Sequence, residues 1–533
     1  MSLAQFEPGN NTIATLIFTI IRIIALINLL NNYLKFFLFY YKMETNNEFK
    51  YKLVIPSTLK DNNQTEPNSV EYYKNYNSDL LFEIMDEEKK GKLHILYSNF
   101  LKNHGYSTNF LIPYYDETKS KVVHMIVLNN AEDVERIAMK HVKKTPYLKP
   151  LVYDSIISTT NTKSWRTQRK NYQHSFSVEN ELKKLIPNIM FRANIGVKIL
   201  NELNKYCDEE YLDIHEFFLN ETMAQLQLNM FGLSNDFQEK TNKKIRNAFN
   251  GQNVEYANEF VYSLLEEIKK SNGSLSKAMV NYNKSFNSNK KEIYGNALIF
   301  PFAGHDTTAN TLSWLIFEVC KNDLIYKKLQ KEVDDFWCNH KDSEIEYNDL
   351  KELKYMNRCI METLRLWTSI PNGTSRELIE DDYIIGKSGE KVKIPAGTYV
   401  QIPNWTRHRN PELWGDDVNE FNPDREFRDE EIYDNQGIGT YNPNSERYSP
   451  FTYAPRDCIG KNFSQIEMRI ILLYLIKNFK FIIPKHQIEK YTYENISFNS
   501  KTLAPRNIFN NDLYEGKFGM YVKVLSRNMH SKI

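Results

Sequence analysis

The segment Glu292–Cys320 is a long, almost continuous apolar run, and it constrains the fold more than any other stretch of this chain. A helix that is apolar all round has to be buried. Near its middle, "PFAGHDTTAN" (Pro301–Asn310) places an acid, Asp306, beside a hydroxyl, Thr307. A buried acid and alcohol are costly unless they have a task such as relaying protons. The chain of 533 residues is long enough to bury this helix together with a bulky cofactor.

Gly304 lies two residues before Asp306 and has no side chain, so we expect a groove where a small ligand rests against the helix backbone. Pro301 and the neighbouring hydroxyls favour a local kink. The same stretch is equally compatible with a kinked core helix whose polar groups are satisfied and which has no catalytic role.

The five cysteines are scattered and include no CxxC pair, which excludes a disulfide framework and a zinc ribbon. Such sparse use of cysteine is typical of a reducing compartment. The cysteines are Cys207, Cys320, Cys338, Cys359 and Cys458. We interpret the first four as small buried hydrophobic residues.

The fifth cysteine has special neighbours in "FTYAPRDCIG" (Phe451–Gly460). The apolar helix predicted directly after Cys458 would stabilise a thiolate through its N-terminal dipole and free N–H groups. Gly460 would let a flat cofactor approach closely, and Arg456 could pair with a cofactor carboxylate. The alternative is an ordinary buried cysteine at a junction between a loop and a helix.

Two further stretches combine charged residues at helical spacing. In "ETLR", Glu362 and Arg365 share one helix face with apolar neighbours, and a buried pair of this kind needs a third partner, which Arg425 of "FNPDREF" offers. In "WRTQR", Trp165 and Arg169 could together bind a carboxylate. Taken alone, each stretch is also compatible with charged residues on a solvent-exposed helix face that have no function.

A basic face adjoins Trp165 and Arg169 on the same predicted helix, and it consists of Lys163, Arg166 and Lys170. It would suit an acidic docking partner, although the stretch alone favours a solvated basic helix. The formal net charge of the whole chain is +1, which gives no reason to expect a nucleic-acid partner.

The N-terminal run Thr12–Lys42 is long enough to cross a bilayer, which needs about 20 apolar residues. Lysines follow it and Arg22 lies inside it, so the globular part is predicted on the cytoplasmic side. We predict a single-pass membrane anchor at residues 1–42 and a polar, irregular linker at 43–90. A helix lying at the membrane surface and a buried core helix are the alternatives.

The rest of the chain predicts mainly helices with a minor sheet. "HILYSNFLKNHG" predicts a helix that ends at Gly105, and "KVVHMIVL" predicts a strand. Helices are expected from about residue 131 to 354. A β-rich patch follows in "DDYIIGKSGEKVKIPAGTYVQI", with two short strands and a turn at Ser388 and Gly389, and the tail from Phe481 again suggests strands.

In order and spacing, these segments resemble the cytochrome P450 family of heme-thiolate monooxygenases. The family pattern is WxxxR, AGx(D/E)T(T/S), ExxR, a PER-type segment and FxxGxRxCxG. The matching stretches are Trp165–Arg169, Ala303–Thr308, Glu362–Arg365, Asn422–Arg425 and Phe451–Gly460. The resemblance covers roughly residues 90–530, and it implies one globular domain of this fold at residues 91–533.

The resemblance also implies roles for single residues. Cys458 would be the axial ligand of iron in heme b (iron-protoporphyrin IX). Asp306 and Thr307 would be the catalytic pair that manages proton delivery. The residues expected to bind the cofactor are Trp165, Arg169, Ala303, Gly304, Arg376, Phe451, Arg456, Cys458 and Gly460, with Ala303 and Gly304 lining a groove for oxygen. Glu362, Arg365 and Arg425 would form a structural triad.

The function implied is insertion of one oxygen atom from O2 into a lipophilic small molecule. Electrons would come from a separate NADPH-dependent reductase of the cytochrome P450 reductase type, docked on the basic face. The location implied is the membrane of the endoplasmic reticulum. Two alternatives stay open: an enzyme of the same fold that rearranges peroxides or dehydrates, and a heme-binding protein without catalysis.

The chain departs from the family pattern near the cysteine. Ala454 stands where the pattern has glycine. If that position requires a positive φ, alanine would cost about 1 kcal/mol and shift the loop.

Overall fold

The computed structural model describes residues 77–527 except 117, 118, 120, 207–210, 234–253, 286–288, 342–344, 387, 433–444 and 494–518. Helices make up most of this part, and three small sheets accompany them. The predicted fold class, mainly α with a minor β region, is confirmed. The predicted anchor at residues 1–42 lies outside the described residues.

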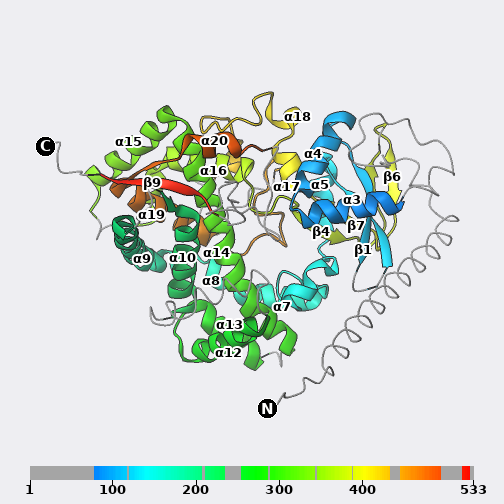
Figure 1. Cartoon of the computed structure of the whole chain (residues 1–533). Coiled ribbons are helices and arrows are strands. Elements are labelled where there is room, and N and C mark those ends of the chain that lie inside the picture. The colour runs from blue at the N-terminus through cyan, green and yellow to red at the C-terminus, as the bar shows by residue number, and fades with distance from the viewer. Residues whose placement is uncertain are drawn as a thin grey trace, which may run out of the picture.

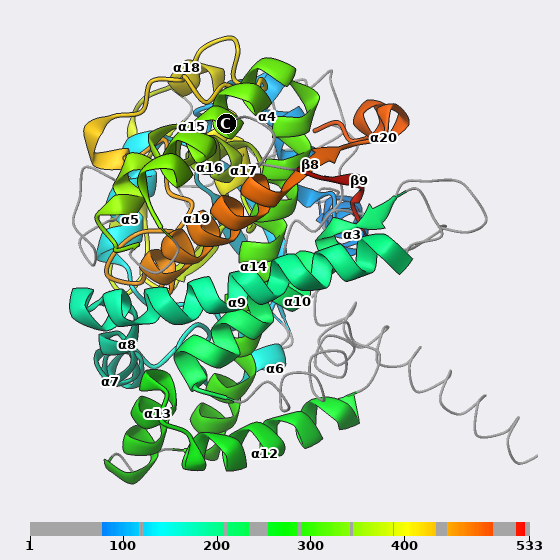
Figure 2. The ribbon, with the colours of Figure 1, turned by 90° about the vertical axis from the view of Figure 1, so that its left-hand side faces the viewer.

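The helical part is built around α14 (Lys290–Lys321), which contains the apolar run. Most of its middle is buried, as an all-apolar helix requires. Its most extensive neighbour is α10 (Ile214–Leu226), and α9 (Glu179–Tyr206) crosses both, as Figure 2 shows. α19 (Lys461–Asn478) packs along α9 and α14.

The remaining helices surround this group (Figure 1). They are α3 (Asn77–Lys89), α4 (Leu93–His104), α5 (Ala131–Lys140), α6 (Lys149–Val152), α7 (Thr162–Tyr172), α8 (His174–Ser177), α12 (Val254–Lys270), α13 (Ser274–Ser285), α15 (Asp323–Asn339), α16 (Lys354–Leu366), α17 (Asn404–His408), α18 (Pro411–Trp414) and α20 (Lys485–Lys490). Short 3-10 turns are η2 (Pro146–Leu148), η4 (Asp349–Glu352) and η5 (Asp429–Glu431), and η3 (Gln227–Phe231) is a π-helical turn.

The largest sheet has the order β1-β2-β7-β4. The strands are β1 (Phe110–Asp116), β2 (Lys121–Val127), β7 (Tyr399–Ile402) and β4 (Thr374–Glu377), with β2 and β7 parallel. β5 (Asp382–Ile385) and β6 (Lys391–Ile394) form a hairpin, and β3 (Leu212–Asp213), β9 (Tyr521–Ser526) and β8 (Phe479–Ile482) form the third sheet. Figure 1 shows the first sheet with α3, α4 and α5 on one side of the molecule.

Local predictions hold where the pattern is strongly periodic. The helix ends at His104 with Gly105 at its cap, and the predicted strand is β2. The expected irregular linker differs over residues 77–89, which form α3. Leu80 and Ile84 are buried there, because their spacing of four residues puts both on one helix face. Within the described part of the chain, no helix has the length and apolarity to span a membrane.

A buried carboxyl group lies in this helical core without a partner. Glu467 of α19 is fully buried, and neither of its carboxyl oxygens has a hydrogen-bond partner among the described residues. Burial, followed by the nearby charge of Glu221 on α10, raises the pKa of Glu467 well above its usual range. Arg192 of α9 is ion-paired with Glu221 at 2.8 Å instead. Glu467 is therefore a neutral acid in the folded protein.

This raised pKa predicts a fall in stability with rising pH. Unfolding lets Glu467 ionise at about pH 4.3. Above that pH its contribution to the free energy of unfolding falls by about 1.4 kcal/mol per pH unit, until the folded pKa is passed. Glu467→Gln removes this dependence, so unfolding midpoints measured from pH 5 to 9 should decline less steeply than in the wild type. The control Glu202→Gln, at an exposed ion pair with Lys205, should leave the slope unchanged. Equal slopes for Glu467→Gln and the wild type would contradict this account.

Candidate functional site

The loop before α19 holds Cys458 by its backbone. The Cys458 N–H donates to the Phe451 carbonyl oxygen at 2.9 Å, which closes the loop. α19 then begins at Lys461, with Gly460 at its N-cap, so the cysteine precedes a helix as the sequence predicts. A Cβ added to Gly460 would meet nothing within 4 Å, so the backbone is open on this side.

The charge of the Cys458 sulfur is set by opposing effects. Its side chain has accessible surface, yet enough protein surrounds the sulfur that burial raises the pKa of the thiol above its usual range. A hydrogen bond from the Gly460 backbone, together with Arg169 and Lys461, acts in the opposite direction and lowers this pKa. The effect of burial on this pKa is larger than the stabilisation of the thiolate expected from the helix N-terminus. A bound metal cation is the group that deprotonates a coordinating thiol outright.

Ala454, the departure from the family pattern, does not adopt a positive φ. Thr452 has a φ of 58°, and Ala454 is not among the described non-glycine residues with positive φ. The condition under which alanine would be strained, a positive φ at this position, is therefore not met. The unusual conformation lies two residues earlier, at a position where the pattern gave no signal.

Four basic side chains from four segments come together near this loop. They are Lys144, Arg169 of α7, Arg376 of β4 and Arg456. Arg376 and Arg456 are buried, and the Arg456 guanidinium lies 4.9 Å from the ring centre of Trp165. Arg376 donates to the Thr374 hydroxyl at 2.6 Å, and Lys144 donates to the same hydroxyl.

These cations lack neutralising acids. Only Arg169 has an ion-pair partner within the described part of the chain, Asp457 at 2.7 Å. Among the described residues, Arg456 donates only to backbone carbonyls, such as that of Val142 at 3.0 Å, and the Nε and Nη2 atoms of Arg376 have no acceptor.

Their pKa values reflect this environment. Burial, followed by the charges of Arg376 and Arg169, lowers the pKa of Arg456 to about 8. Burial alone lowers that of Arg376 to about 10. Burial, with Arg376 and Arg456, depresses the pKa of Lys144 well below its usual range. A ligand with two carboxylates would relieve all three effects.

Lys144 is the member of this group that sequence reasoning missed. It lies in "HVKKTP", where two adjacent lysines look like ordinary surface charge. The four strand residues Thr374–Glu377 bring Arg376 beside it, at a separation of more than 200 residues. No local pattern could have supplied that contact.

The acid and the hydroxyl of α14 lie half-buried on neighbouring positions. The Thr307 hydroxyl donates to the Ala303 carbonyl oxygen at 2.9 Å, and the Thr307 carbonyl accepts from Ser369 at 3.0 Å. Asp306 instead accepts from the Asn310 amide at 3.3 Å. The two groups therefore have separate partners. Ala303 is partly buried beside the main hydrophobic cluster.

The expected groove at Gly304 is filled by a neighbouring helix. A Cβ on Gly304 would come within 2.8 Å of the Leu226 methyl groups on α10. The missing side chain therefore allows α10 and α14 to pack closely, rather than leaving room for a ligand at this point. This corrects the interpretation of Gly304 as a groove residue.

Glu362, Arg365 and Arg425 come together as a buried group. The Glu362 carboxylate accepts two hydrogen bonds of 2.7 Å from Arg365 and one of 3.1 Å from Arg425. Arg365 also donates to the carbonyls of His408 and Val418. These bonds connect α16 to the segments around His408, Val418 and Arg425.

The basic face of α7 is open to solvent. Lys163, Arg166 and Lys170 are exposed, while Trp165 on the opposite side is buried. None of the three forms an ion pair with a described residue. Unpaired, exposed charges of one sign are what a docking surface for an acidic partner requires.

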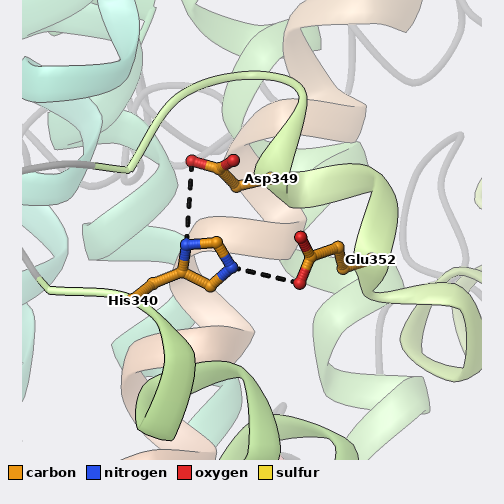
Figure 3. A group of neighbouring side chains, drawn as sticks. All are labelled: His340, Asp349 and Glu352. Atoms are coloured by element: carbon orange, nitrogen blue, oxygen red, sulfur yellow. Dashed lines mark hydrogen bonds and ion pairs between the residues drawn. The ribbon is translucent and has the colours of Figure 1, made fainter.

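A separate surface cluster is formed by His340, Asp349 and Glu352 (Figure 3). His340 Nε2 lies 3.0 Å from a Glu352 oxygen, and Nδ1 lies 3.9 Å from an Asp349 oxygen. The two carboxylates face opposite edges of one ring, so a single ion could not replace both contacts. The ring also stacks on Phe336. This is the geometry of an ion-paired helix end, because His340 caps α15.

Part of the chain is similar to known proteins of one family. Residues 269–504 match the family model described as cytochrome P450. Putative cytochrome P450 CYP13A2 of Caenorhabditis elegans is 36% identical over 190 residues, which are 36% of this chain and 33% of that protein. Cytochrome P450 52-N1 of Starmerella bombicola is 34% identical over 195 residues, 35% of each chain. These alignments span about a third of the length of the relatives.

Residues 269–504, which are less than half of the chain, thus match the cytochrome P450 family. The cofactor of this family is heme, iron-protoporphyrin IX. The residues present fit this group: Cys458 offers a thiol two residues after Arg456, and three cations without acidic partners among the described residues suit its two propionate carboxylates.

Proposed function

We propose that this protein is a heme-thiolate monooxygenase that inserts one oxygen atom from O2 into a lipophilic small molecule. The observation that carries the proposal is the placement of Cys458 at the start of α19, next to buried cations that lack acidic partners. The family match supports the class of reaction.

Each group has a part in this proposal. Cys458 would ligate the iron of heme b, and Lys144, Arg169, Arg376 and Arg456 would hold the propionates beside Trp165. The cofactor supplies the oxygen chemistry. Asp306 would hold a proton for delivery, and the Thr307 hydroxyl would orient it. Ala303 and Phe451 would flank the cofactor, and Gly460 would leave room beside the sulfur.

The partners and location follow as proposals from the same class. Electrons would come from a separate NADPH-dependent reductase that docks on Lys163, Arg166 and Lys170. The chain would be anchored in the membrane of the endoplasmic reticulum, with its catalytic part on the cytoplasmic side. The relatives' names specify no substrate, so the substrate class stays at lipophilic small molecules.

Isotope incorporation tests the reaction. Purified protein, a reductase and NADPH are incubated under 18O2 with a panel of fatty acids, sterols and small aromatics. We expect product that carries one 18O atom, formed only when oxygen and reductase are both present. Cys458→Ser, with the same heme load, should form none.

Two other results would contradict the proposal. Product formed from peroxide substrates without reductase would indicate a rearranging enzyme. Heme binding without any turnover would indicate a non-catalytic protein. The only sequence feature that favoured the latter was strain at Ala454, and the backbone has no positive φ at that residue.

The docking surface gives a kinetic prediction. Reversing the charges of Lys163, Arg166 and Lys170 to glutamate should slow heme reduction by tenfold or more at low salt, and less at high salt, because steering is screened. The absorption spectrum should not change, since all three side chains are exposed. Stopped-flow reduction by the reductase measures the rate.

A matched control carries the same charge change elsewhere. Lys198 on α9 and Lys269 and Lys270 on α12 are also exposed. Reversing these three should leave the reduction rate within about twofold. Equal slowing in both triple variants would show that net charge, and not the face of α7, governs reduction.

A further inference from the structure

A chain of hydrogen bonds links Asp306 to a histidine on another helix. The Asp306 carboxylate accepts from the Asn310 side-chain N–H at 3.3 Å, one turn further along α14. The Asn310 oxygen lies 2.9 Å from Nε2 of His215, on the first turn of α10. Asn310 is fully buried and His215 nearly so. The chain therefore runs from the half-buried acid into the contact between two packed helices.

The chemistry of the amide gives this chain a direction. Asn310 uses its N–H on the carboxylate, so its oxygen is left to accept, and His215 must donate from Nε2. The bonds thus run from imidazole to amide to carboxylate. Each donor supports the negative charge of the next group.

The position of His215 is fixed by its backbone. The Asp213 side chain caps α10 and accepts the His215 N–H at 3.0 Å. The same carboxylate accepts the Met520 N–H at 3.1 Å, which ties the start of α10 to the third sheet. The packing of Gly304 against Leu226 brings α10 close to α14 on the same side. The imidazole is therefore held rigidly with respect to the acid.

We propose that His215 and Asn310 are positioning residues for the proton-delivering acid. They hold the Asp306 carboxylate toward α10, while the Thr307 hydroxyl is bonded to the Ala303 carbonyl. This arrangement keeps the acid apart from the hydroxyl until a proton is transferred. The proposal rests on the proposed function, since a positioning role needs an acid that delivers protons.

The test compares variants that break the hydrogen bonds between His215, Asn310 and Asp306 with a variant that leaves them intact. His215→Phe and Asn310→Leu remove the donors but keep the volume. His215→Gln retains an N–H and serves as the rescue. Thr222→Val is the control, because the Thr222 hydroxyl also joins α10 to α14, by donating to the His305 carbonyl at 2.9 Å, without touching Asp306.

The first readout is the share of reduced oxygen that leaves as hydrogen peroxide instead of product. This share should rise about threefold or more in His215→Phe and Asn310→Leu, and return toward the wild type in His215→Gln. Thr222→Val should not change it. In an Asp306→Ala background, His215→Phe should add nothing further. Equal effects in the broken-chain variants and in Thr222→Val would overturn the proposal.

The second readout does not depend on turnover. The thermal unfolding midpoints of His215→Phe, Asp306→Ala and the double variant form a double-mutant cycle. If the two side chains are coupled, the shift of the double variant should differ from the sum of the two single shifts. Additive shifts would overturn the link. If the wild type gives no oxygen-dependent product but the shifts are non-additive, the proposed function fails while the link between the helices stands.

Discussion

The structure depends on how a group of buried positive charges is neutralised. Arg376 and Arg456 lie inside the protein with no acidic side chain against them among the described residues, and Lys144 lies beside them. Leaving a buried charge without its partner costs about 3–5 kcal/mol. An anion bound beside these cations would offset this cost, and heme carries two carboxylates. β4, α7 and the Cys458 loop contribute the arginines of this group, Arg376, Arg169 and Arg456.

The cost of an unpaired buried charge also explains the state of two other buried charged groups. Glu362 has two arginines, and their remaining N–H groups go to backbone carbonyls, so that group is satisfied without any ligand. Glu467 has no cation and is neutral instead. Glu362 is thus paired, Glu467 is protonated, and the cations at the proposed heme site are left for the cofactor.

Much of the fold and site could be predicted because the signals are local. The run around Asp306 predicts a buried helix by its composition, and the residues around Cys458 predict a ligand loop by their order. Glu362 and Arg425 could be paired because a buried carboxylate with one arginine implies a further partner. These inferences use spacing that holds within a single helix or loop.

What could not be predicted depends on the meeting of distant segments. The role of Gly304 depends on Leu226 of α10, and that of Lys144 depends on β4. The φ of Thr452 depends on how the loop closes, and α3 depends on a core that Leu80 and Ile84 help to fill. In each case the structural role of the residue depends on a tertiary contact that the neighbouring sequence does not specify.

The most direct test of the account is the carbon-monoxide difference spectrum of the reduced protein, recorded for the wild type and for Cys458→Ser. The account predicts a thiolate-type band in the wild type. It also predicts that the band disappears in the variant while heme remains bound, because Arg376, Arg456 and Lys144 still hold the propionates. A histidine-type spectrum in the wild type, or a thiolate band that survives the substitution, would contradict it.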